Sequence, residues 1–201
     1  MKYNIVLIGA MGIGKTTISN LICEQNNAYS VLDSDAIKGG LVEKLGFDEK
    51  EYQEILDQKG WLESNNYARN FLKPEHLNVI LDVASSNKII NLGGDFIDWN
   101  NEEDFEKCHK YLRDYPNVIM LRYSNDLKEN YDELSKRIKK RINKDTSESL
   151  QQQVEYNLTY IQSDLFSKVA KHVIETKGKT EDEVAMEIIK IYSDSIPKID
   201  D

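Results

Sequence analysis

The sequence has little of what disulfide-rich, zinc-binding and membrane proteins are built from. Its 201 residues include two cysteines, Cys23 and Cys108, which lie far apart, and three histidines. Neither a disulfide framework nor a Cys/His zinc site is therefore expected, and any bound metal should be a hard cation held by oxygen. No apolar run approaches the roughly 20 residues of a membrane span, and no signal peptide is recognisable. We expect a cytoplasmic protein with no membrane partner.

Basic residues are fewer than acidic ones, 26 against 35, so the formal net charge is −9 at pH 7. A mean field of this sign repels nucleic acid, so a small molecule is the expected partner. The length and a hydrophobic content of 40% suffice for one sizeable core. We therefore expect residues 1–201 to form a single domain, present as a monomer or weak dimer.

Short apolar runs alternate with helical patterns along the whole chain. Strands are expected at residues 2–8, 31–32, 88–92, 117–121 and 172–175. Helices are expected at 15–25, in several pieces within 36–86 with a break at Pro74, and at 102–112, 126–144, 150–169 and 181–192. This order predicts an α/β fold of the P-loop type, with a doubly wound parallel sheet covered by helices on both faces. Residues 36–86 are a candidate helical substrate-binding insertion, and 126–150 a candidate lid.

A glycine-rich loop directly follows the first expected strand and precedes a helix. The segment Gly9-Ala-Met-Gly-Ile-Gly-Lys-Thr16 fits the pattern G-x-x-x-x-G-K-[ST]. Its glycines let backbone N–H groups point at phosphates, and the positive end of the helix adds to the attraction. Lys15 is the expected catalytic cation on the β- and γ-phosphates of ATP, and Thr16 a ligand of Mg²⁺. The expected nucleotide-binding residues of the loop are Gly9, Met11, Gly12, Ile13, Gly14, Lys15, Thr16 and Thr17.

Two acidic residues, Asp33 and Asp35, follow the second expected strand. Residues two apart on an extended segment point to the same side, so both carboxylates could face the phosphate loop. One of them would then hold Mg²⁺ through water, while the other would orient or deprotonate the attacking hydroxyl of the substrate. The alternative is that Asp35 simply caps the helix that follows.

Four further residues are candidates for the substrate or metal side of the site. Gly93 and Gly94 end the third strand, where they would allow a substrate to approach the backbone closely. Asp95 is either a metal-side carboxylate or part of an ordinary turn. Arg69 either binds an anionic group of the substrate or lies on a helix surface.

Basic residues gather between positions 137 and 144 of this otherwise acidic chain. Cations that close over a triphosphate stabilise the charge on the transferred phosphoryl group. In this interpretation Arg137 binds the nucleotide and Arg141 is catalytic. The alternative is a solvated helix face, paired with acidic neighbours such as Asp132 and Glu133.

Several of these segments together resemble the shikimate kinase family. The resembling segments are residues 5–17, Asp33-Ser-Asp35, Leu92-Gly-Gly94, and 164–176 followed by 180–184. The resemblance implies an ATP- and Mg²⁺-dependent kinase with shikimate as acceptor, in which Asp33 serves Mg²⁺ and Asp35 the substrate hydroxyls. Three positions depart from the family pattern: Asp95 replaces a third glycine, Gln162 replaces a substrate-binding arginine, and a second arginine has only Arg69 as a displaced candidate.

Two other functions fit the same phosphate loop. A nucleoside or nucleotide kinase would use residues 36–86 as a base pocket, with Tyr52, Trp61 or Tyr67 stacking on the base, although core packing also explains these rings. An ATP-binding regulatory protein that has lost its acceptor site would explain the absent arginines.

Overall fold

The computed structural model describes residues 4–84, 87–99, 101–141 and 147–196. Its centre is a five-stranded sheet in the order β2-β3-β1-β4-β5, in which all neighbouring strands are parallel. The strands are β1 (Ile5–Ile8), β2 (Ser30–Asp33), β3 (Lys88–Asn91), β4 (Asn117–Arg122) and β5 (His172–Glu175). The predicted fold class, a parallel α/β sheet flanked by helices, is confirmed.

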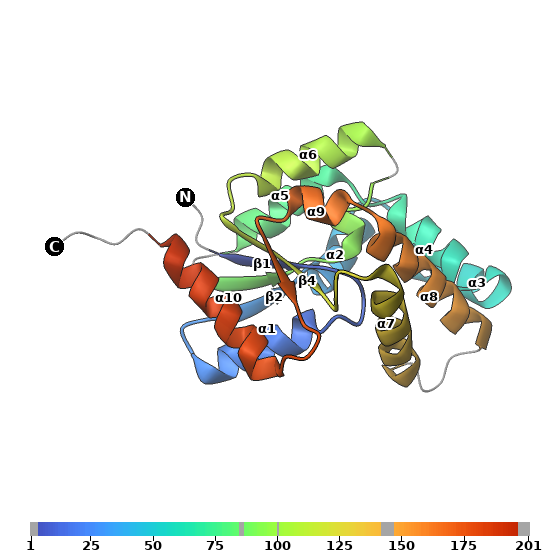
Figure 1. The fold of residues 1–201 in the computed structure, drawn as a ribbon. Helices are drawn as coiled ribbons and strands as arrows, with labels where there is room; N and C mark the ends of the chain where they lie inside the picture. The colour runs from blue at the N-terminus through green and yellow to red at the C-terminus, as the bar shows by residue number, and fades with distance from the viewer. Residues whose placement is uncertain (1–3, 85–86, 100, 142–146, 197–201) are drawn as a thin grey trace.

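Helices cover both faces of this sheet (Figure 1). They are α1 (Lys15–Gln25), α2 (Ser34–Glu43), α3 (Glu49–Lys59), α4 (Trp61–Arg69), α5 (Pro74–Val83), the 3₁₀ turn η1 (Gly94–Phe96), α6 (Glu102–Leu112), α7 (Leu127–Arg141), α8 (Ser147–Gln162), α9 (Leu165–Val169) and α10 (Glu181–Ser195). Helix α1 packs against α10 on one face, and α5 packs against α6 on the other. The remaining long helices form a lobe at one end of the sheet, where α4 packs on α3 and α8, and α8 on α7.

The central strand explains why the core forms where it does. All four residues of β1 are fully buried, because the strand has a neighbour on each edge and helices on each face. A run without polar alternation is what such a doubly covered parallel strand requires. None of the helices in the described part of the chain is long and apolar enough to span a membrane.

The prediction of a single helix over residues 150–169 is wrong, because α8 ends at Gln162 and a separate helix, α9, begins at Leu165. The Ser163 hydroxyl accepts a hydrogen bond from the Leu165 N–H at 3.2 Å. This local bond satisfies the backbone without a continuous helix. The break expected at Pro74 falls over residues 70–73, and Pro74 itself opens α5, where its missing N–H costs nothing.

The start of the phosphate loop generates a stability prediction. Gly9 has φ +139°, and a Cβ there would lie 2.4 Å from the carbonyl oxygen of Leu121 in β4. We expect Gly9→Ala to lower the free energy of unfolding by at least about 1–3 kcal/mol, through backbone strain and this clash. Urea unfolding followed by circular dichroism measures the change.

The matched control is Gly39→Ala in helix α2, where a Cβ would meet nothing within 4 Å. That substitution should raise the free energy of unfolding by about 0.5–1 kcal/mol, because alanine is the better helix former. Equal effects of the two substitutions would contradict the close approach of Gly9 to β4.

Candidate nucleotide and acceptor site

The loop between β1 and α1 is shaped to receive phosphates. Gly9, Gly12 and Gly14 all have positive φ angles of 139°, 81° and 109°, which L side chains rarely adopt. A Cβ on Gly14, the N-cap of α1, would meet nothing within 4 Å, so the space above the start of the helix is open. The first turn of α1 contains no acidic residue. An anion would therefore meet N–H groups and the positive end of the helix without opposing charge.

Lys15 folds back over its own loop. Its Nζ donates to the carbonyl oxygens of Gly9, at 2.7 Å, and Ala10, at 3.3 Å. Thr16 and Thr17, the next two residues, are exposed at the start of the helix. The ammonium, the hydroxyls and the open cradle together form the donor set that ATP phosphates need.

Helix α8 holds the tip of the loop through Asn157, a residue that the sequence pattern did not reveal. The Met11 N–H donates to Asn157 Oδ1 at 2.8 Å, and Asn157 Nδ2 donates to the Met11 carbonyl at 3.1 Å. Asn157 is 1% exposed. A buried amide that satisfies both groups of one peptide residue fixes the position of that residue.

Helix α7 places Arg137 against the other side of the loop. One of its terminal nitrogens donates to the Ile13 carbonyl at 3.4 Å, and its guanidinium lies 5.6 Å from the ring centroid of Tyr123. Its Nε also bonds Glu133 at 2.9 Å. Arg137 thus reaches the loop and pairs along its helix at the same time. The side chain of Arg141 lies outside the described residues.

Asp33 and Asp35 are not on one extended segment, which corrects the sequence-based expectation. Strand β2 ends at Asp33, and Asp35 lies in the first turn of α2. Asp33 is the N-cap of that helix, because its Oδ1 accepts from the Asp35 N–H at 3.0 Å. The capping role considered for Asp35 therefore belongs to Asp33. Ser34, between them, accepts from the Gly93 N–H at 2.8 Å and joins α2 to the end of β3.

The carboxylate of Asp35 lies directly beside Gly93. A Cβ on Gly93 would lie 2.8 Å from Asp35 Oδ1, so a side chain at this position would displace the carboxylate. Loss of surrounding water raises the pKa of Asp35 above its usual value. The negative charges of Asp33 and Asp95 raise this pKa further, whereas the positive charges of Lys38 and Lys15 lower it. The influence of Lys15 places Asp35 within electrostatic reach of the phosphate loop.

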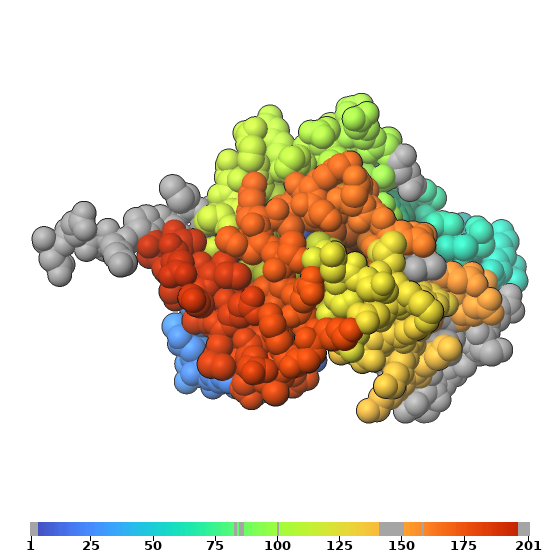
Figure 2. All heavy atoms as spheres, in the orientation of Figure 1, coloured from blue at the N-terminus to red at the C-terminus, as the bar shows by residue number. Residues whose placement is uncertain are grey.

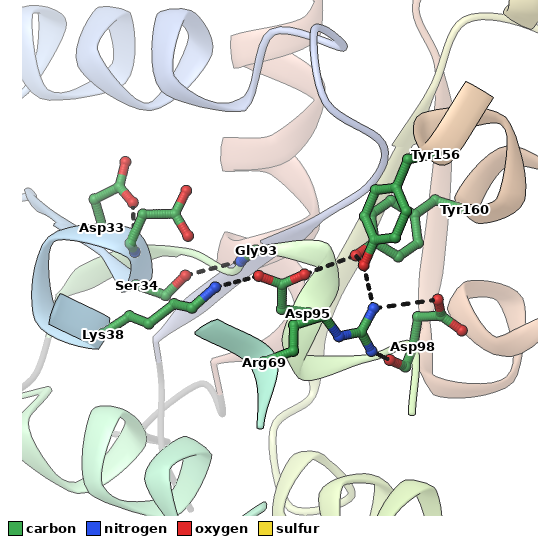
Figure 3. A network of polar contacts seen from close by, with 10 residues as sticks. Asp33, Ser34, Lys38, Arg69, Gly93, Asp95, Asp98, Tyr156 and Tyr160 are labelled. Carbon is green, nitrogen blue, oxygen red and sulfur yellow. Dashed lines mark hydrogen bonds and ion pairs between the residues drawn. The ribbon is translucent and has the colours of Figure 1, made fainter. Parts of the chain in front are cut away.

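Asp95 lies at the centre of a network of polar contacts (Figure 3). It forms an ion pair with Lys38 of α2 and accepts a hydrogen bond from the Tyr160 hydroxyl of α8 at 2.7 Å. The Tyr160 ring lies over Gly94, since a Cβ there would be 2.7 Å from the ring. Gly93 and Gly94 thus do permit close approach, but in this structure the approaching groups are Asp35 and Tyr160.

Arg69 extends the same network from α4 (Figure 3). It donates to the Tyr156 hydroxyl and to the backbone carbonyl of Asp98, and lies 4.0 Å from the Asp98 carboxylate. The Tyr156 and Tyr160 hydroxyls lie 2.9 Å apart and are hydrogen-bonded, with Tyr156 as the donor because Tyr160 gives its single proton to Asp95. This bond closes the chain of contacts back to Asp95. Arg69 therefore does not merely lie on a helix surface, because its side chain is only 12% exposed.

A hollow of about 220 Å³ adjoins the phosphate loop on the side of β4. Its lining includes Ala10 and Ile13 from the loop, Asn130 from α7 and Gln162 at the end of α8. Figure 2 shows this face, where the yellow surface of α7 meets the orange surface of the segment containing α9. Gln162 thus lies in this hollow, whereas Arg69 lies in the Asp95 network.

The aromatic residues considered for base stacking pack on other rings. Tyr67 lies 5.7 Å from Phe47 between ring centroids, and Tyr52 lies 5.8 Å from the same ring. Trp61 packs edge-on against Tyr156 at 5.3 Å. The packing interpretation of these rings therefore accounts for their positions.

The site offers few protein oxygens to a magnesium ion, and an ion that is bound together with a nucleotide needs only a few. No group of three His, Cys, Asp or Glu residues suited to a metal occurs in the part of the chain that the structure describes. Mg²⁺ bound with ATP needs only one or two protein oxygens, because phosphates and water supply the rest. The exposed Thr16 hydroxyl and the Asp33 carboxylate fit that role. Asp95 is already paired with the Lys38 ammonium.

The parallel sheet, the phosphate loop and the carboxylate beside it define a P-loop kinase. The sequence matches the family model described as shikimate kinase over residues 11–193. The chain therefore belongs to the shikimate kinase family.

Solved structures show the same fold at low identity. The shikimate kinase of Acinetobacter baumannii, solved with shikimate, has a TM-score of 0.57 and 22% identity, over 96% of this chain and 95% of that one. A tunicamycin resistance protein of Deinococcus radiodurans has a TM-score of 0.56 and 15% identity, over 98% of each chain. A gluconokinase of Sinorhizobium meliloti has a TM-score of 0.54 and 13% identity, over 96% of this chain and 94% of that one. A search among proteins of curated function found no match.

The contact between α8 and the loop can be tested with Asn157→Leu. Leucine keeps the size of the side chain but leaves both polar groups of Met11 without this partner. We expect ADP affinity, measured by isothermal titration calorimetry, to fall about 2- to 12-fold, which corresponds to the loss of one hydrogen bond's contribution of about 0.5–1.5 kcal/mol.

The control is Asn78→Leu in α5, which removes only a surface contact with Asp82. It should leave ADP affinity unchanged. If Asn157→Leu bound ADP as tightly as the unaltered protein, the tip of the loop would not depend on α8.

Proposed function

We propose that the protein is an ATP- and Mg²⁺-dependent kinase that transfers the γ-phosphoryl group to a hydroxyl of a small molecule. The observation that carries the proposal is the position of Asp35. It lies at the start of α2, beside Gly93, within electrostatic reach of Lys15. A carboxylate beside a phosphate cradle is the arrangement that phosphoryl transfer to a hydroxyl needs.

Each residue then has a defined task. The amides of the loop and the Lys15 ammonium hold the β- and γ-phosphates, and Thr16 and Asp33 would hold Mg²⁺, which neutralises phosphate charge when bound. The acceptor oxygen forms a bond to the γ-phosphorus as the bond from phosphorus to the ADP oxygen breaks. Asp35 accepts the proton that leaves the acceptor hydroxyl. Its raised pKa suits this role, because a base with a higher pKa binds the proton more strongly.

The family and the neighbours supply acceptors for a first test. Shikimate is present in one neighbour's structure, and another is a gluconokinase. Coupled ADP release with Mg-ATP, measured against hydroxyl compounds with and without acidic groups, tests the proposal. Saturable stimulation by one of them supports it.

Lys15 provides a prediction on the nucleotide side. Lys15→Ala should reduce acceptor-dependent ADP release at least a hundredfold, because the charge on the transferred phosphoryl group loses a preorganised cation. The control Lys177→Ala removes an exposed lysine that pairs with Glu129 and should retain turnover. Full turnover in Lys15→Ala would contradict the assignment of the loop.

Asp35 provides a prediction about pH. Turnover should fall as pH drops through the raised pKa of Asp35, since the base is then protonated. Asp35→Asn should lower turnover about 10²–10⁴-fold, remove that limb of the pH profile and leave ADP affinity intact.

The same substitution has an opposite effect on stability. A raised pKa means that folding disfavours the ionised carboxylate, so Asp35 costs stability once pH exceeds its folded-state pKa. Asp35→Asn should therefore unfold at a slightly higher urea concentration at pH 7, the gain being small because Asp35 is exposed and water screens its charge. A variant that is both inactive and less stable would indicate a structural role instead.

A further inference from the structure

Among the described residues, two cations at the acceptor side, Lys38 and Arg69, are already paired with carboxylates of the protein. Lys38 lies one turn after Asp35 on α2, and its ammonium pairs with Asp95. The two side chains are only 17% and 16% exposed. An incoming anion could use Lys38 only by separating it from a largely buried partner.

Arg69 is also already bound to other groups of the protein. Its guanidinium bonds Tyr156 and the Asp98 carbonyl, with the Asp98 carboxylate at 4.0 Å. The charge of Arg69 also acts on Asp95. Lys38 is thus paired with Asp95 and Arg69 with Asp98, while Asp95 lies within electrostatic reach of both cations.

Asp95 itself is ionised in this setting. Burial opposes its charge, but the Lys38 ammonium, the hydrogen bonds from Lys38 and Tyr160, and the Arg69 guanidinium together hold the pKa of Asp95 below its usual value. Tyr160 keeps its proton, since burial and the neighbouring Asp95 carboxylate raise the pKa of Tyr160. The network therefore contains an internal anion that is paired with Lys38 and lies within electrostatic reach of Arg69.

The charges around this point are unfavourable for a second anion. The carboxylates near this point outnumber the cations that balance them, Lys38 and Arg69. These carboxylates, which are close enough to shift the pKa values of their neighbours, are Asp33, Asp35, Asp95 and Asp98. Lys15 is assigned to the phosphates. An acidic acceptor would have to displace Asp95, and an unpaired buried carboxylate is costly.

We infer that the acceptor is a hydroxyl compound without an anionic group, either neutral or amine-bearing, because Asp95 and Asp98 already pair with Lys38 and Arg69, the cations that the described residues place at the acceptor side. This inference rests on the proposed kinase function. It separates the chain from an acceptor such as shikimate, which carries a carboxylate. The same site would tolerate an ammonium group, since the surrounding carboxylates outnumber the cations.

The first experiment uses acetate as a minimal carboxylate probe, so it does not depend on the true acceptor. The Arg69 Nε–H signal, assigned by its loss in Arg69→Lys, is followed by nuclear magnetic resonance during an acetate titration at constant ionic strength. The unaltered protein should show no saturable shift. Asp95→Asn keeps the size of the side chain but removes the internal anion, and should show a saturable shift.

The control variant is Asp57→Asn in α3, an exposed position that changes the net charge equally. It should behave as the unaltered protein. A saturable shift in the unaltered protein, or none in Asp95→Asn, would overturn the inference.

The second experiment compares shikimate with its uncharged methyl ester, and gluconate with glucose, in coupled ADP release and in binding with ADP present. Preference for the uncharged member of a pair, reduced at least tenfold in Asp95→Asn, supports the inference. Stimulation of the unaltered protein by an acidic acceptor would overturn it and leave the kinase proposal supported. If no acceptor stimulated ADP release while acetate still left Arg69 unshifted, the kinase proposal would fail and the charge assignment would be supported.

Discussion

The acceptor side of the molecule depends on one buried anion, the carboxylate of Asp95. Lys38 from α2 and Tyr160 from α8 contact it directly, and Arg69 from α4 acts on it by its charge and is joined to it through Tyr156 and Tyr160. Removing one member of a buried charged network leaves the others unpaired, which costs more than the contact contributes. The anion therefore fixes where α2, α4 and α8 stand relative to the end of β3. That arrangement in turn sets which molecules can approach Asp35.

Local sequence patterns predicted the parts of the site that are local in space. The phosphate loop needs only glycines, a lysine and a threonine between one strand and one helix, so its eight residues carry the whole signal. The helices over 15–25 and 102–112 were predicted with the observed bounds, because their apolar spacing and polar ends are both clear. The start of α2 was misread because Asp33 and Asp35 both suit an N-cap, and the sequence alone does not say where β2 ends.

The polar network was beyond such reasoning, for a physical reason. Asp95 is 57 residues from Lys38 and 65 from Tyr160 in the chain, and Tyr156 is 87 from Arg69. A lysine at one helical turn after Asp35 has no distinctive spacing, since any helix surface carries such residues. Similarly, Asn157 has no sequence signal, because a buried amide is recognised only by the backbone groups it satisfies.

Helix α8 joins the nucleotide side to the acceptor side. Asn157 bonds the backbone of Met11 in the loop, while Tyr156 and Tyr160 bond Arg69 and Asp95. Residues 156, 157 and 160 are within about one turn of each other, and an α-helix keeps such residues in fixed relative positions. The position of the phosphate loop and the position of the Tyr160 ring over Gly94 are thus set by the same rigid element. A change in the loop that moved Asn157 would also move Tyr160, so α8 makes the shape of the acceptor side depend on that of the nucleotide cradle.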